Sequence, residues 1–331
     1  MKGSAFDRNE EANFLTRRGI ERAAAGQSGA LEDFEEAIRI RLTLPLEDDP
    51  IFPWGLSAGW INRGDVLARD GRFSEAVTSY DEGIAVLGRL EESRAVKCRL
   101  AVAWGNRGLA LEAMGQSDEA RQSFGRGVVD EPEDDAQRLH SAVARVHLSR
   151  VVEDRKLAIS EAEQALDLVR ELESQDVLAA ETGLKARHQL CGRLCEELEA
   201  GVREGDWIAR VTDRVEEALV LERFWERRGV KSLRSVAADL FRLGLRVYRV
   251  CQPHFLAEFV LDAMDPERSP GAPWEDLSFQ GAAAVALRTA IDDGAERGVW
   301  NAAERGEREL AIIGTLRAAD QRLAELQRPA H

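Results

Sequence analysis

The amino-acid sequence predicts an all-helical fold built from repeated pairs of helices. The chain is rich in Ala, Leu, Glu and Arg, which favour helices, and runs of β-branched residues of strand length are scarce. No proline occurs between Pro132 and Pro253, which suits long helices joined by short turns. A block of sequence also recurs 44 residues later. Of the 331 residues 44% are hydrophobic and 32% are charged, which is enough apolar material for a packed core.

The recurring block begins with Trp-Ile-Asn-Arg-Gly at residues 60–64, which returns as Trp-Gly-Asn-Arg-Gly at residues 104–108. The match then continues without a gap at the same offset of 44 residues. Its further pairs are Leu67 with Leu111, Gly71 with Gly115, Glu75 with Glu119, Ala76 with Ala120, Tyr80 with Phe124, and Gly83 with Gly127. So many ungapped matches indicate an internal repeat.

The spacing within each copy indicates two antiparallel helices. Gly64 and Leu67 fall at helical intervals on one face of a first helix. Gly71 ends this helix at a position where a left-handed backbone is needed. A second helix opens around Ser74, a predicted N-cap, and contains Tyr80. The small glycine in the first helix and the aromatic ring in the second allow the two helices to approach closely.

A looser copy precedes these two. Arg18 and Gly19 open it, Gly26 ends its first helix, and Ala30 and Phe34 lie in its second helix. The distance from Gly26 to Ala30 is one residue shorter than in the other copies, so its turn is expected to differ.

The order of Trp, Gly, Leu, Gly, Ala, aromatic and small residues at 57–88 and 101–132 resembles the tetratricopeptide repeat, and Pro132 fits that family's terminal proline. The resemblance implies a right-handed α-solenoid of antiparallel helix pairs, with about three repeats over residues 9–135. The family period is about 34 residues, whereas the glycines here are 45 and 44 residues apart. The additional residues lie at 44–56, where the sequence favours a loop, and at 90–100, where it favours a helix extension.

Beyond residue 135 the helical pattern continues while the repeat signature fades, so we expect degenerate helical repeats over 136–229 and further helices over 230–331. The predicted helices lie near 136–153, 157–175, 178–201, 206–228, 231–251, 254–264, 276–296 and 299–327. The last of these is expected to cap the solenoid, because a terminal repeat needs a polar outer face.

Charge and the absence of apolar runs restrict the partners. A net charge of −15 disfavours nucleic acid and anionic membrane surfaces as partners. The chain has no apolar stretch of signal-peptide or membrane-spanning length, so we expect a cytoplasmic protein. Its four cysteines are scattered along helical sequence, which is unlike a disulfide framework.

The resemblance also implies a binding groove, because the first helices of such repeats line a concave surface and their asparagine often hydrogen-bonds the backbone of a bound peptide. The candidate residues are Asn62, Arg63, Asp65, Arg69, Asn106, Arg107, Leu109 and Glu112, with Ile61 beside them. The alternative is that the Asn-Arg pairs serve only packing between repeats. A basic clamp for a peptide carboxylate, known in some members, is expected to be absent, because Val102 and Asn106 occupy two of its positions.

Two further clusters have a functional and a structural interpretation. His188, Cys191 and Cys195 share one helical face and could bind zinc, although the same spacing is typical of a core stripe. Arg242, Arg246 and Arg249 form a basic face that could meet an acidic peptide or phosphate, or could be solvated or paired with carboxylates. We expect no metal from the first cluster, since no fourth ligand lies nearby.

Enzyme signatures are missing: the sequence has no HExxH motif, no GxSxG elbow and no dinucleotide-binding glycine fingerprint. We therefore expect no enzyme and no cofactor. The predicted function is a protein–protein interaction module that binds a peptide or helix of a partner in its concave groove. The alternative is a self-assembling scaffold, a homodimer formed through the C-terminal helices.

Overall fold

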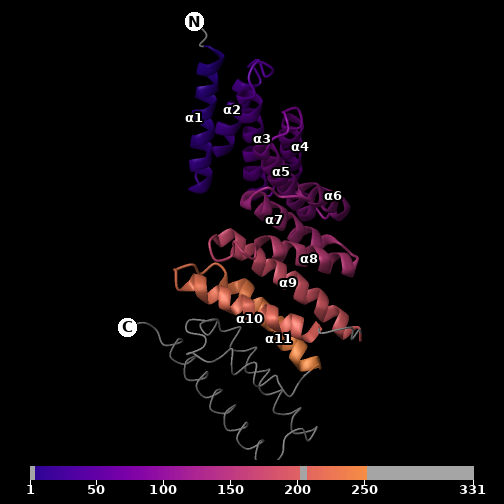
Figure 1. The fold of residues 1–331 in the computed structure, drawn as a ribbon. Coiled ribbons are helices and arrows are strands. Elements are labelled where there is room, and N and C mark those ends of the chain that lie inside the picture. Colours follow the sequence, from indigo (N-terminus) through magenta and orange to yellow (C-terminus); the bar gives the residue numbers. More distant parts are fainter. Residues whose placement is uncertain (1–3, 202–206, 252–331) are drawn as a thin grey trace, which may run out of the picture. The chain divides into compact units, whose positions relative to one another are not determined.

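The structure is a computed structural model that describes residues 4–201 and 207–251, and its regular structure in these ranges is entirely helical (Figure 1). The chain divides into two compact units, residues 1–153 and 154–331. Helices of the first unit are α1 (Ala5–Ala24), α2 (Ala30–Arg41), α3 (Ile51–Arg69), α4 (Phe73–Leu87), α5 (Arg94–Ala113), α6 (Ser117–Gly127) and α7 (Asp135–Val151). Those described in the second unit are α8 (Arg155–Val169), α9 (Val177–Glu199), α10 (Trp207–Glu226) and α11 (Arg234–Cys251).

Helices of the first unit form antiparallel pairs stacked in sequence order. Helix α1 packs on α2, α3 on α4 and α5 on α6, while the second helix of each pair packs on the first helix of the next. The first helices α1, α3, α5 and α7 also contact their neighbours in that series. This arrangement confirms the predicted α-solenoid, in which the first helices form one layer and the second helices form another.

The repeated glycine and aromatic residue of each pair meet between the two helices. A Cβ atom added at Gly19, Gly64 or Gly108 would lie 2.8, 2.6 or 2.5 Å from the ring of Phe34, Tyr80 or Phe124, respectively. These rings are almost fully buried, at 0–1% exposure. The looser first copy makes the same contact as the other two, although its connection of five residues, 25–29, is longer than their three. The contact therefore defines the repeat.

The turn between α3 and α4 is shorter than the sequence indicated. Gly71 has a φ of 76°, and its N–H and that of Arg72 donate to the carbonyls of Ala68 and Leu67 at 3.1 and 2.8 Å. Only three residues, 70–72, connect the two helices through this Schellman turn, so α4 already begins at Phe73. The prediction of Ser74 as N-cap is therefore wrong, because Ser74 lies inside the first helical turn.

The residues that lengthen the period extend the first helices. The loop predicted over 44–56 is wrong beyond Pro50, since α3 begins at Ile51 with Pro53 in its first turn, where a missing N–H is tolerated. The helix extension predicted within 90–100 is confirmed from Arg94, preceded by the N-cap Ser93. As a result α3 and α5 have 19 and 20 residues, whereas their partners α4 and α6 have 15 and 11.

In the second unit α9 packs against α8, α10 and α11, and α10 also packs against α11. Arg187 of α9, only 3% exposed, is ion-paired with Glu173 and Glu217. The indole N–H of Trp225 donates to the carbonyl of Glu173 at 2.7 Å. The helices predicted after residue 251, including the capping helix, lie outside the described residues.

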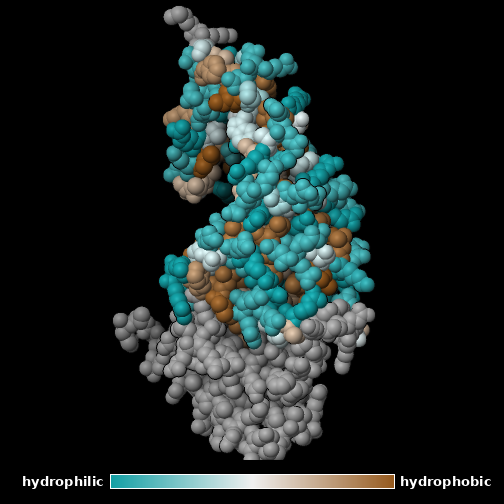
Figure 2. All heavy atoms as spheres, viewed as in Figure 1, coloured by the Kyte–Doolittle hydropathy of each residue, from teal (hydrophilic) through white to brown (hydrophobic). Residues whose placement is uncertain are grey.

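Among the coloured residues of Figure 2, hydrophilic residues cover most of the face shown. None of the described helices combines the length and the apolar character needed to cross a lipid bilayer.

Candidate functional site

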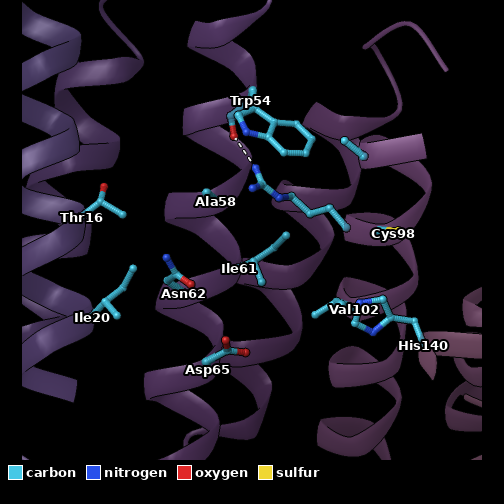
Figure 3. Close-up of a pocket in the computed structure, with 12 residues that line it drawn as sticks. Thr16, Ile20, Trp54, Ala58, Ile61, Asn62, Asp65, Cys98, Val102 and His140 are labelled. Atoms are coloured by element: carbon cyan, nitrogen blue, oxygen red, sulfur yellow. Dashed lines mark hydrogen bonds between the residues drawn. The ribbon is translucent and has the colours of Figure 1, made fainter. Parts of the chain in front are cut away.

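A groove of about 590 Å³ lies in the layer of first helices of the N-terminal unit (Figure 3). Its lining residues are Thr16 and Ile20 of α1, Trp54, Ala58, Ile61, Asn62 and Asp65 of α3, Ala95, Cys98, Arg99 and Val102 of α5, and His140 of α7. Four successive first helices thus contribute to one cavity. In Figure 3, Thr16 and Ile20 lie across from Asn62 on α3.

The middle of the groove is apolar. Ala58 and Ile61 of α3 and Val102 of α5 line it together with Ile20 of α1. Ile20 is 50% exposed, so a large apolar side chain faces the open groove. Covering such a surface with a ligand contributes about 25 cal/mol per Å² of apolar area removed from water.

Asp65 lies at one end of the lining helix α3. Its Oδ1 accepts hydrogen bonds from the Tyr80 hydroxyl and from the Asn106 amide, both at 2.9 Å. Burial raises the pKa of Asp65 above its ordinary value, against the opposing effect of these two bonds and of the charge on Arg69. Both bonds end on Oδ1, and Oδ2 has no hydrogen-bond donor among the described residues.

Arg99 lies near the opposite end of α3. Its guanidinium carbon is 3.4 Å from the centroid of the Trp54 indole, and its Nη1 donates to the Trp54 carbonyl at 3.0 Å. None of the described carboxylates forms an ion pair with Arg99. Burial lowers the pKa of Arg99 to about 10, so its charge is retained at neutral pH. The groove therefore contains a stacked cation with no counter-ion from the described part of the chain.

A second arginine lies behind the groove. Arg41 of α2 is 1% exposed, and its guanidinium donates to the side chains of Thr16 at 2.9 Å and Asn13 at 2.7 Å. Its space is provided by Gly55 of α3, where a Cβ atom would lie 2.6 Å from the Arg41 Nε. Its hydrogen-bond partners in the described chain are neutral, and burial lowers the pKa of Arg41 to about 10.

Only some of the predicted groove residues lie at the groove. Asn62 and Asp65 line the groove, and Asn106 reaches Asp65 from α5. The two arginines of the Asn-Arg pairs instead face the layer of second helices. Arg63 binds Glu35 of the preceding pair and Ser79 of its own pair, and Arg107 binds Asp81 and Ser123 in the same way, at 2.6–3.0 Å.

The remaining three predicted residues lie outside the groove lining. Arg69 donates to the carbonyl of Ala23 in α1 at 2.6 Å. Leu109 is 39% exposed on α5. Glu112 is ion-paired with Arg150 of α7.

Sequence reasoning missed Trp54, Arg99 and His140. Trp54 and Arg99 belong to the two segments that lengthen the period, which the sequence predicts to be a loop and a helix extension and to which it assigns no groove residue. One signal in the sequence could have identified Arg99. It lies five residues before the repeat tryptophan Trp104, within the predicted extension of the first helix. The pKa of His140 is lowered by burial, so this imidazole is held mainly in its neutral form at pH 7.

The two other clusters lie in the second unit. Cys191 and Cys195 are buried in α9 and their thiols donate to the carbonyls of Val211 and Leu243 at 3.9 Å. Burial raises the pKa of the Cys191 thiol, which opposes thiolate formation. No group of His, Cys, Asp or Glu in residues 4–201 and 207–251 is arranged to hold a metal ion.

On the predicted basic face of α11, Arg242 is ion-paired with Asp239 in the same helix and Arg246 is exposed. The side chain of Arg249 is outside the described part of the chain.

The comparison with known protein families supports the repeat assignment. Residues 101–128 match the sequence profile of the tetratricopeptide repeat. Among solved structures, a tetratricopeptide repeat protein from Parabacteroides merdae ATCC 43184 is similar, with 14% sequence identity and a TM-score of 0.36 over 94% of this chain and 99% of that chain. No curated protein sequence matches the chain.

Proposed function

The chain is a tetratricopeptide repeat protein, and we propose that it binds a peptide segment of a protein partner in the groove between α1, α3, α5 and α7. Repeats of this family generally mediate interactions between proteins. The observation that carries the proposal is the groove itself. The helices α1, α3 and α5 present apolar side chains to it, α7 adds His140, and polar groups lie toward its two ends.

The chemistry of the lining suits a peptide. Ile20, Ala58 and Val102 offer contact to apolar side chains, and their removal from water supplies non-directional affinity. Asn62 offers two amide donors and one carbonyl acceptor, which match the alternating groups of an extended main chain. Among the described residues, no other side chain forms a hydrogen bond with the Asn62 amide, which lines the groove.

A peptide selection tests the proposal even though the partner protein has not been identified. The full chain is immobilised and used to select from a random peptide library, and the dissociation constants of enriched peptides are measured by fluorescence polarisation. The variant Ala58→Arg places a long side chain into the middle of the groove and should weaken binding at least tenfold. The matched control is Ala85→Arg, the same substitution at an exposed position of α4 in the other layer.

The result expected is selection of peptides that bind the wild-type chain and Ala85→Arg equally and Ala58→Arg weakly. If no peptide is enriched, or if Ala58→Arg binds the enriched peptides as tightly as wild type does, the groove is not the binding site. Thermal unfolding of both variants by circular dichroism confirms that any loss occurs in a folded protein.

Self-assembly through the C-terminal helices is the second hypothesis from the sequence. Most of residues 230–331 lies outside the described residues, and none of the contacts described here favours it.

A further inference from the structure

We infer that the partner segment is extended and zwitterionic, with a side-chain carboxylate bound by Arg99 and, about five residues away, a basic side chain bound by Asp65. The inference rests on the proposed function and specifies its ligand. It follows from the two polar ends of the groove and from the distance between them.

The Arg99 end is suited to a carboxylate. A guanidinium carries five N–H donors, and the described contacts of Arg99 use one of them, on the Trp54 carbonyl. Stacking on the indole of Trp54 fixes the plane of the guanidinium and leaves its edge available for two parallel hydrogen bonds. The chain as a whole carries a net charge of −15. An arginine in the groove without a counter-ion among the described residues therefore gives this end of the groove a local positive charge.

The carboxylate is assigned to a side chain of the partner rather than to its C-terminus. Ala95 lines the groove one helical turn beyond Arg99 on α5. The groove therefore continues past the guanidinium, and a bound chain has room to continue with it.

The Asp65 end is suited to a donor. Oδ1 already accepts from Tyr80 and Asn106, which fixes the carboxyl group and leaves Oδ2 for a ligand in the groove. Asp65 is partly buried, so an isolated negative charge there is costly, and an ammonium or guanidinium from the partner would favour the ionised form. The acidic character of the chain as a whole also favours a basic group at this end.

The separation of the two ends sets the spacing. Trp54, on which Arg99 stacks, and Asp65 are eleven residues apart on α3, which corresponds to about 16 Å at a rise of about 1.5 Å per residue. An extended chain advances about 3.3 Å per residue, so about five residues cover this distance. Ala58 and Ile61 lie between the ends and would contact apolar side chains in the middle of the segment.

A peptide series with acetylated and amidated ends tests the inference. Each peptide has one Glu and one Lys separated by two to eleven positions, with apolar residues between them, and binding to the full chain is measured by fluorescence polarisation. We expect the tightest binding at a separation of about five. For that peptide, a double-mutant cycle between Arg99→Gln in the protein and Glu→Gln in the peptide measures their coupling. Each single change should weaken binding about tenfold, and the double change no further.

The same cycle is made between Asp65→Asn and replacement of the peptide Lys by norleucine. The control matched to Arg99→Gln is Arg121→Gln. It removes an exposed arginine from α6 outside the groove and should leave the affinity for every peptide unchanged. Gln at position 99 retains a donor for the Trp54 carbonyl, and circular dichroism checks the fold. If Arg99→Gln does not fold, Arg99→Lys keeps the charge but loses the planar donor edge, and binding should still weaken.

Several results would overturn the inference. Additive effects in both cycles would show that Arg99 and Asp65 do not contact the charged residues of the peptide. A preferred separation near eleven would show a helical ligand, and binding that requires a free C-terminus would show a terminal carboxylate. In each of these cases peptides still bind and Ala58→Arg still weakens binding, so the proposed function stands. Absence of binding by every peptide in both the library and the series would overturn both.

Discussion

Two glycines of α5, three residues apart, should respond in opposite directions to the same substitution. A Cβ atom at Gly108 would lie 2.5 Å from the Phe124 ring, whereas a Cβ atom at Gly105 meets nothing within 4 Å. The Phe124 ring cannot yield easily, because it is fully buried and its other face stacks on His147 of α7, with ring centroids 5.2 Å apart. Gly105→Ala is therefore the internal control for Gly108→Ala.

The magnitudes follow from two opposing effects. Replacing Gly by Ala inside a helix stabilises the folded state by roughly 0.5–1 kcal/mol, and only this effect operates at Gly105. Forcing a methyl group into a packed core costs roughly 1–3 kcal/mol, which at Gly108 outweighs the helix gain. We expect Gly105→Ala to raise the free energy of unfolding and Gly108→Ala to lower it. The helix gain is common to both variants, so they should lie about 1–3 kcal/mol apart.

Urea unfolding of the full chain, followed by far-UV circular dichroism, measures the difference. With a slope of about 2 kcal/mol per M, the two midpoints should differ by roughly 0.5–1.5 M. A Gly108→Ala variant as stable as Gly105→Ala would refute the reasoning, because the glycine would then not be required by the close approach of the Phe124 ring.

Three further predictions concern charged groups. Burial raises the pKa of Asp65 in the folded chain, so the folded state binds a proton at this carboxyl more tightly than the unfolded state does. The free energy of unfolding of wild type, relative to that of Asp65→Asn, should therefore fall as the pH rises from 4 through the folded pKa. Urea denaturation of both proteins across pH 4–8 measures this trend. An increase in relative stability over that range would contradict it. Arg41→Lys should lower the free energy of unfolding by about 2 kcal/mol in urea titration, because an ammonium cannot reproduce the planar set of hydrogen bonds; a change below about 0.5 kcal/mol would contradict this. Glu173→Gln should lower the free energy of unfolding by about 3 kcal/mol, because the buried charge of Arg187 then keeps a weaker set of partners. Glu181→Gln removes a more exposed ion pair on α9 and should lower it by less than about 0.5 kcal/mol.

The sequence predicted the helix pairs well because their packing is local and periodic. The offset of 44 residues preserved the Gly64 and Tyr80 contact in the next copy, so a pattern of residue sizes was enough to find two antiparallel helices. The start of α3 was missed for a physical reason. Pro50 and Pro53 suggest a loop, but a proline in the first turn of a helix lacks only an N–H that would have no partner in the helix.

The candidate site was less predictable than the fold. Asn62 and Asp65 lie on the face expected for the groove, since they follow the helical period of the repeat. Arg63 could not be assigned by periodicity alone, because its long side chain reaches Glu35, a residue of another helix pair. Arg99 lay outside the repeat signature altogether, and its relation to Trp54 depends on how two neighbouring pairs stack. Such contacts depend on tertiary structure and leave no periodic signal.

The opposite directions of Asn62 and Arg63 have a consequence for how the protein can change over evolution. Arg63 holds the preceding helix pair through Glu35, as Arg107 does through Asp81, and both arginine side chains are largely shielded, at 18% and 21% exposure. Asn62 makes no such contact and faces the groove. Under the proposed function, recognition and assembly depend on adjacent positions of one helix whose side chains have separate neighbours. A substitution at position 62 can therefore change which partner binds without disturbing the contact between Arg63 and Glu35 that links two helix pairs. Partner specificity can then change during evolution while the stacking of the repeats is retained.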